Sequence, residues 1–380
     1  MQHIILIVVI LCTALSLYSG CGSLKLDTPL TSTENDWLIG GGSPERLHFQ
    51  QTRLAPPFIP DWEYNAGAGF ASNALLAKGD ILFISTLHGE LHLVNIETGR
   101  RIGRMNVSEP ISGSPVLRDN RIYLPLAGGD ETLIAYDLLA GKKSWSKNIG
   151  PVESSLLLHN DILYAVSRNG TVYAFNPDNG TVHWKQELGS NIYASPSAAD
   201  ERMYLGTSAG IVFALDYSDG SVVWKSDTLR TIMTAAVAGG NAVYVASRDS
   251  VLYSLDNEKG GVVWSYNAGS RIYSAPSAGP DYVVFGTAGG KVIALDSASG
   301  TKRWSYRAKS IVNSSPLIAG DFVYFVSLDK NIYVLNNHDG TLQWSYEISS
   351  RLKTTPLIRG ERLIICAEDR RVYSFKREIK

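Results

Sequence analysis

Tryptophan recurs along this 380-residue chain at an almost constant interval. Six tryptophans are 39 or 40 residues apart, and each follows a glycine by four residues. They are Trp145, Trp184, Trp224, Trp264, Trp304 and Trp344. A period near 40 residues is typical of β-propeller blades and of helical arrays, so the local pattern has to separate the two.

Each copy of the repeat consists of short runs rich in β-branched and aromatic residues. In the sixth copy these runs cover residues 273–278, 282–287, 291–295 and 301–307, which predicts four strands. The connector before each tryptophan begins with Asp or Asn and ends with Gly, a composition that favours tight hairpin turns. A run of ten or more residues with a helical stripe is missing from the sequence, so helical arrays are excluded.

Eight copies of the innermost strand can be counted along the chain. They begin near Phe70, Ile111, Val152, Ile192, Ile232, Ile272, Val312 and Leu352. The last copy lacks a fourth strand, but residues 58–67 (FIPDWEYNAG) match residues 262–269 (VVWSYNAG) and place Trp62 at the tryptophan position. We therefore predict an all-β, eight-bladed β-propeller of four-stranded antiparallel blades over residues 58–380, closed by the N-terminal strand completing the last blade.

The seven tryptophans, Trp62 included, then have a structural interpretation. One indole ring per blade fills the wedge between neighbouring sheets, where an aromatic side chain buries a large area. We expect these rings to hold the blades together rather than to bind a ligand.

Composition and cysteine content restrict the classes of partner. A net charge of −1 supplies no field that would attract nucleic acid, so nucleic acid is excluded as a main partner. The cysteines are Cys12, Cys21 and Cys366, which leaves at most one in the propeller and therefore no intrachain disulfide there. We expect Cys366 to be a buried strand residue.

The first residues look like a targeting signal. The apolar run of residues 4–17 is too short to span a bilayer comfortably and suits a secretion signal, predicted over residues 1–20. Residues 17–21 (LYSGC) resemble a bacterial lipobox, which implies that Cys21 is lipidated and that Gly22 directs the protein to the periplasmic side of the outer membrane. An ordinary cleaved signal or an uncleaved anchor remains the alternative. Residues 21–57 are predicted to form a lipidated lead-in, with residues 24–57 as an extended tether.

The motif at residues 252–264 (LYSLDNEKGGVVW) resembles the pyrroloquinoline-quinone (PQQ) type of propeller repeat. An eight-bladed propeller of this type on a lipoprotein anchor is most similar to the BamB-type lipoproteins of outer-membrane β-barrel assembly. The resemblance implies a non-enzymatic periplasmic scaffold without a cofactor, which contacts the barrel-forming subunit and unfolded outer-membrane proteins. Arg230, in the connection of residues 226–236, is the one charged partner contact that the resemblance carries over.

Two other functions stay open at this point. A lipoprotein propeller could instead bind a small molecule or glycan, or serve another envelope complex. A quinoprotein dehydrogenase is the least favoured, because that family has an adjacent cysteine pair and a set of calcium ligands, whereas this sequence has no Cys-Cys pair. Its Asp and Asn residues recur once per turn, and His88 and His92 lack an evident third zinc ligand. We predict neither catalytic nor metal-binding residues.

The segments that lead into the inner strands carry the remaining candidates. Large or polar side chains stand there among small ones such as Ser155 and Ser195. They are Glu153, Tyr193, Arg271, Tyr273, Asn313, Arg351 and Lys353. These residues either line a solvated channel mouth or form a site for a peptide or a small ligand.

Overall fold

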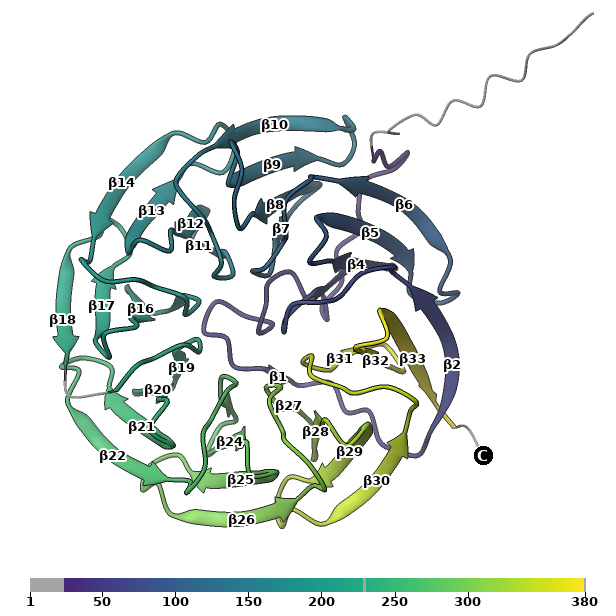
Figure 1. Ribbon diagram of the computed structural model, residues 1–380, viewed down its shortest axis with the longest axis vertical. Coiled ribbons are helices and arrows are strands. Elements are labelled where there is room, and N and C mark those ends of the chain that lie inside the picture. Colours follow the sequence, from purple (N-terminus) through teal and green to yellow (C-terminus); the bar gives the residue numbers. More distant parts are fainter. Residues whose placement is uncertain (1–23, 228–229, 379–380) are drawn as a thin grey trace, which may run out of the picture.

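A computed structural model describes residues 24–227 and 230–378. These residues form eight small antiparallel sheets arranged as a wheel around a central axis (Figure 1). The described part of the chain contains no helix, and so none that could cross a membrane. The predicted signal segment and Cys21 lie outside the described residues.

Seven blades follow one another along the chain, each with four consecutive strands from the axis outward. Blades 1 to 4 consist of β3 (Leu75–Lys78), β4 (Ile81–Ser85), β5 (Glu90–Asn95) and β6 (Arg101–Asn106); β7 (Val116–Arg118), β8 (Arg121–Pro125), β9 (Leu133–Asp137) and β10 (Lys142–Lys147); β11 (Leu157–His159), β12 (Ile162–Val166), β13 (Thr171–Phe175) and β14 (Val182–Glu187); and β15 (Ser197–Ala199), β16 (Arg202–Gly206), β17 (Val212–Asp216) and β18 (Val222–Ser226). Blades 5 to 7 consist of β19 (Val237–Gly239), β20 (Ala242–Ala246), β21 (Val251–Asp256) and β22 (Val262–Asn267); β23 (Ser277–Ala278), β24 (Tyr282–Gly286), β25 (Lys291–Asp296) and β26 (Lys302–Arg307); and β27 (Leu317–Ala319), β28 (Phe322–Val326), β29 (Asn331–Asn336) and β30 (Leu342–Glu347).

The eighth blade joins the two ends of the propeller. Its inner strands are β31 (Leu357–Arg359), β32 (Arg362–Cys366) and β33 (Arg371–Arg377), and its outer strand is β2 (Phe58–Asn65). Strand β2 pairs antiparallel with β33 from Phe58↔Arg377 to Asn65↔Arg371. The predicted eight-bladed propeller and its closure by the N-terminal strand are therefore confirmed.

The innermost strands are shorter than the sequence pattern suggests. In blade 5 the predicted strand begins near Ile232, but β19 starts at Val237 and Ile232 makes only an isolated bridge to Ser247. Leu352 likewise makes a single bridge, to Ala367 in blade 8. Eight chain segments converge near the axis, and their backbone groups bond to neighbouring loops instead of continuing the ladder.

The repeated tryptophans link each blade to the next. Trp304 of blade 6 donates its Nε1–H to the carbonyl of Asn337 in blade 7 at 2.8 Å, and its ring lies over Gly340 in the same turn. The same arrangement joins five further pairs of blades. In those pairs Trp62, Trp145, Trp184, Trp224 and Trp264 donate to Ile96, Pro177, Tyr217, Asn257 and Ser297. Trp344 faces the closing blade, where its ring packs against Phe58 at a centroid distance of 5.1 Å.

Blade 1 has Gly103 where the other blades carry tryptophan, and the lead-in fills the vacancy. A Cβ at Gly103 would lie 2.3 Å from Cδ1 of Leu24, so this leucine occupies the space of the missing ring. The amide of Leu26 donates to the carbonyl of Leu138 at 2.7 Å, the turn carbonyl of blade 2 that corresponds to Asn337 in blade 7. Residues 24–26 thus replace an indole with two buried leucines and a backbone N–H.

The rest of the lead-in crosses the centre of the wheel (Figure 1). Residues 37–50, which we call the plug, accept backbone hydrogen bonds from the inward edges of six inner strands. The donors are Ala77, Leu117, Ala198, Ala238, Ala278 and Ile318. Within the plug, β1 (Phe49–Gln50) pairs parallel with β27. A buried ion pair between Asp36 and Arg359 (2.8 Å) attaches the start of the plug to blade 8.

The expectation that residues 24–57 form an extended tether is therefore wrong. The inner strands leave unpaired N–H groups along the axis, and the lead-in satisfies them. Apolar side chains that showed no periodicity in the sequence, including Trp37 and Ile39, become part of the core between the blades.

Candidate functional site

Two sets of side chains surround the axis on the side of the wheel away from the plug. In each blade, the mouth-ring residue directly follows the buried aliphatic or aromatic residue that begins the inner segment, and the floor-ring residue comes two positions after it. The mouth ring is Ala71, Ser112, Glu153, Tyr193, Met233, Tyr273, Asn313 and Lys353, and the floor ring is Asn73, Ser114, Ser155, Ser195, Ala235, Ala275, Ser315 and Thr355. Most members of both rings line one axial cavity of about 160 Å³.

Seven of the eight floor-ring residues are Ser, Ala or Thr, because neighbouring blades meet there. The amide of Ser114 donates to Oγ of Ser155 at 3.0 Å, and the amide of Ser155 donates to Oγ of Ser195 at 2.9 Å. These bonds connect blades 2, 3 and 4 in sequence. Each of the two hydroxyls accepts a bond and keeps its own hydrogen available to donate.

The mouth ring has two chemically different sides. Tyr193, Met233 and Tyr273 stand on the consecutive blades 4, 5 and 6, and Met233 and Tyr273 are 37% and 43% exposed. Ser112, Glu153 and Asn313 provide a polar side from blades 2, 3 and 7. The carboxylate of Glu153 forms an ion pair with Arg168 at 3.0 Å, so its charge is matched at the rim.

The structure brings together four of the residues singled out in the sequence: Glu153, Tyr193, Tyr273 and Asn313 all line the axial cavity. The other candidates lie elsewhere. Arg271, Arg351 and Arg230 are exposed and do not line the cavity, while Lys353 occupies a ring position but directs its ammonium to Glu368 at 3.3 Å. Arg271 and Arg351 lie two positions before the mouth-ring residues of their blades, ahead of the buried aliphatic residue. At that point the chain is still outside the axial cavity.

The plug closes the other end of the channel. Gly40 lies directly beneath the floor ring, since a Cβ there would be 2.8 Å from Cβ of Ser114. Arg46 is fully buried and donates to the carbonyls of Gly40 (2.5 Å), Pro196 (2.5 Å) and Leu156 (2.9 Å). Desolvation lowers the pKa of Arg46 to about 9, so the guanidinium remains charged at neutral pH. The axial cavity is therefore closed at its base.

His48 is the second ionisable residue buried in the plug. It is 1% exposed, and neither ring nitrogen has a hydrogen-bond partner among the described residues. Burial, together with the nearby positive charge of Arg46, lowers the pKa of His48 to about 4. Sequence reasoning missed Arg46 and His48 because the plug lies outside the repeat and carries no period.

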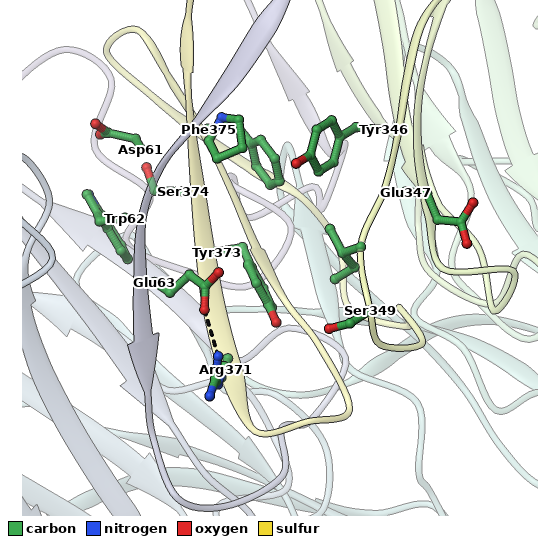
Figure 2. Close-up of a pocket in the computed structure, with 12 residues that line it drawn as sticks. Asp61, Trp62, Glu63, Tyr346, Glu347, Ser349, Arg371, Tyr373, Ser374 and Phe375 are labelled. Atoms are coloured by element: carbon green, nitrogen blue, oxygen red, sulfur yellow. Dashed lines mark hydrogen bonds and ion pairs between the residues drawn. The ribbon is translucent and has the colours of Figure 1, made fainter.

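A second pocket, of about 350 Å³, lies at the seam between blades 7 and 8. Figure 2 shows Tyr346 of β30 and Tyr373 and Phe375 of β33 around it, with an ion pair between Glu63 and Arg371 (2.8 Å) at its edge. The pocket follows from the closure, because β2 brings Trp62 and Glu63 next to β33.

The described residues contain no cluster of His, Cys, Asp and Glu that could hold a metal ion. His92 is buried and its Nδ1 lies 2.8 Å from the hydroxyl of Tyr64, whereas His88 is exposed. Cys366 is buried without a disulfide partner in the part of the chain described, and burial raises the pKa of its thiol.

A comparison with protein-family models shows which family the chain belongs to. A family model described as outer membrane protein assembly factor BamB matches residues 60–157, 150–246, 208–325 and 248–378. The chain belongs to the BamB family. The matches cover nearly the whole propeller and agree with the resemblance that the repeat indicated.

Individual relatives of this family align over shorter stretches. The BamB protein of Moranella endobia is 32% identical over 109 residues, which are 28% of this chain and 26% of that protein. The BamB protein of Legionella pneumophila is 26% identical over 127 residues, 30% of this chain and 32% of that protein. The alignments thus span about a quarter to a third of these relatives.

Solved structures share the fold. BamB from Moraxella catarrhalis superimposes with a TM-score of 0.68 at 18% identity, over 84% of this chain and 100% of that one. A quinohemoprotein alcohol dehydrogenase from Pseudomonas putida gives a TM-score of 0.78 at 11% identity, over 90% and 80% of the two chains.

The axial cavity does not fit the cofactor chemistry of the dehydrogenases that share the fold. Glu153 is the one carboxylate that lines the cavity among the described residues, and Arg168 already pairs with it. Hard cations such as calcium take six to eight oxygen ligands, including several carboxylates. The plug also fills the channel beneath the cavity.

Proposed function

We propose that the protein is a lipid-anchored scaffold on the periplasmic side of the outer membrane. It takes part in the assembly of outer-membrane β-barrel proteins by binding protein partners, and it catalyses no reaction. The family match along the propeller is the observation that carries this proposal. The partners are the barrel-forming subunit of the assembly machinery and unfolded outer-membrane proteins.

The architecture supports a binding role. The closed propeller, with the plug bonded to six of its inner strands, presents loops from eight blades on a rigid support, a common basis for protein recognition. The rim of the mouth carries exposed arginines, among them Arg271 and Arg351, for which no structural ion pair is formed with the described residues. We place the partner contact on this rim.

Affinity purification of the tagged full-length protein from membranes tests the proposal. We expect mass spectrometry to recover the barrel-forming subunit, and Arg351→Glu to reduce its yield at least fivefold. Arg100→Glu is a matched control, because Arg100 is also exposed but lies in the turn between β5 and β6, at the end of its blade away from the mouth. Recovery of no assembly component contradicts the scaffold role, and equal recovery with Arg351→Glu contradicts the rim as the contact.

A further inference from the structure

The mouth ring departs from the regularity of the repeat. The residue before it is always a buried aliphatic or aromatic one, and the floor-ring residue two positions later is Ser, Ala or Thr in seven blades and Asn in blade 1. At the mouth ring itself, Ala71 in blade 1 shows that a methyl group satisfies the fold. Packing around the axis therefore does not require the tyrosines of blades 4 and 6 or the methionine between them.

The exposure of these side chains carries a cost that the fold does not explain. Tyr273 and Met233 leave 43% and 37% of their surface in water, although apolar surface is favourably buried. They form one apolar side of the cavity with Tyr193. An apolar side facing a polar one suits a ligand with one apolar face and several hydrogen-bonding groups.

Unpartnered polar atoms on the cavity wall indicate what that ligand must supply. Ser274 is 7% exposed and its Oγ has no partner among the described residues, but this repeat position faces its own blade, since Ser154 and Thr354 donate there to Val166 and Cys366. Oγ of Ser112 and Oδ1 of Asn313, which line the cavity, are also buried without a partner in the described part of the chain. A buried polar atom without a hydrogen bond destabilises the fold, so a ligand group that supplies the bond is favoured. A serine Oγ can donate a hydrogen bond, whereas Oδ1 of Asn313 can only accept one. Ligand hydroxyl groups can pair with either atom, because each hydroxyl donates one bond and accepts others.

Charge and size limit the ligand further. Glu153 is the one acidic residue among the described lining residues, and Arg168 pairs with it at 3.0 Å, so the cavity wall carries little net charge. Beneath the floor, the buried guanidinium of Arg46 has no carboxylate partner among the described residues and disfavours cations. The cavity volume of about 160 Å³ is below the range of about 300–1,000 Å³ that is usual for drug-sized ligands. A neutral ligand with room for about one ring fits these limits.

We propose that the axial cavity binds one terminal sugar ring of a neutral saccharide, which enters from the mouth. The apolar face of the ring packs against the side formed by Tyr193, Met233 and Tyr273, and its hydroxyls bond to Ser112 and Asn313. This activity goes beyond the scaffold role. Its site adjoins the rim, since Arg271 donates to the hydroxyl of Tyr273 at 3.4 Å, but binding of isolated glycosides is measured without the protein partner.

Saturation-transfer difference NMR on the full-length protein tests the proposal with the methyl glycosides of glucose, galactose, mannose and N-acetylglucosamine. We expect saturable binding of at least one glycoside with a Kd in the millimolar range, as befits a single small ring. Tyr273→Ala and Asn313→Ala should each weaken that binding at least fivefold. Val263→Ala should leave it unchanged, because Val263 is 56% exposed on the outer strand β22.

Three results would overturn the proposal. The first is no saturable transfer from any of the four glycosides. The second is binding that neither Tyr273→Ala nor Asn313→Ala weakens. The third is binding of a neutral capped tripeptide, acetyl-Gly-Ser-Gly-amide, in place of the sugars. A crystal of the unmodified protein soaked with the best glycoside supplies a readout without variants, and density outside the axial cavity contradicts the assignment.

Discussion

The replacement of a tryptophan by residues 24–26 allows a sharp test of how the blades are held together. The perturbation is the double substitution Leu24→Ala and Leu26→Ala, combined with Gly103→Trp. If the lead-in stands in for the missing indole, the two changes must compensate each other. Either change alone should destabilise the protein, because Leu24 occupies the place that the new indole needs.

The structure sets the magnitude. Leu24 and Leu26 are 3% and 7% exposed, and burying a leucine contributes roughly 1.5–3 kcal/mol. The bonds from Leu26 to Leu138 and from Tyr136 to Leu24 contribute about 1 kcal/mol each. Ordering three residues costs about 1–2 kcal/mol per residue, so docking of the segment stabilises the protein by about 2 kcal/mol. The double substitution cannot cost much more, because the segment can detach.

Urea denaturation followed by circular dichroism measures the effect. In the double variant, Gly103→Trp should restore most of the lost free energy of unfolding, because the indole can then donate to Leu138 as its equivalents do in six other blades. In the otherwise unchanged chain the same substitution should destabilise. Equal effects of Gly103→Trp in the two backgrounds would show that the sites are independent and would refute the reasoning.

Three further predictions concern the core, the plug and the anchor. Trp304→Ala should lower the free energy of unfolding by about 3–5 kcal/mol, because the ring is 6% exposed, and a urea midpoint equal to that of the unchanged protein would contradict this. The pKa of His48 is lower in the folded protein than the ordinary 6.5, so protonation favours unfolding: its stabilising contribution is complete above about pH 6.5 and declines toward pH 4. Stability should be about 2 kcal/mol lower at pH 5 than at pH 8 from this group, and His48→Gln should remove that part of the pH dependence. Cys21→Ser should move the protein from the membrane fraction to the soluble fraction, and unchanged fractionation would argue against lipidation.

The repeat was sufficient to predict the propeller. The spacing of successive tryptophans from Trp145 to Trp344 gave the blade length. The match of residues 58–67 to an outer strand predicted the closure that β2 and β33 form. The alignment of the copies also identified Glu153, Tyr193, Tyr273 and Asn313, because residues at one position of a repeat reach the same radius of the wheel. Periodicity therefore predicts both the blades and the residues that line their common axis.

The plug could not be predicted in this way. Its residues bond to inner strands that are 40 to 270 residues away in the chain, from Trp37 with Ala77 to His48 with Ile318, and no local pattern encodes such partners. Arg46 would be read from the sequence as an ordinary surface residue, since arginine is rarely fully buried. Gly103 looked like a simple exception to the repeat, and only the position of Leu24 explains it.

The closed ring is the central claim, because it places the plug, the mouth and the rim. Asn65 and Arg371 are partners in the register of β2 and β33, and paired strand residues have Cα separations within the range of a disulfide. In a chain carrying Cys21→Ser, the pair Asn65→Cys and Arg371→Cys should crosslink on mild oxidation and migrate faster on a non-reducing gel. Asn65→Cys with Lys376→Cys should not, because Lys376 pairs with Ile59, about 20 Å along the strand. Crosslinking of the second pair instead of the first would contradict the closure.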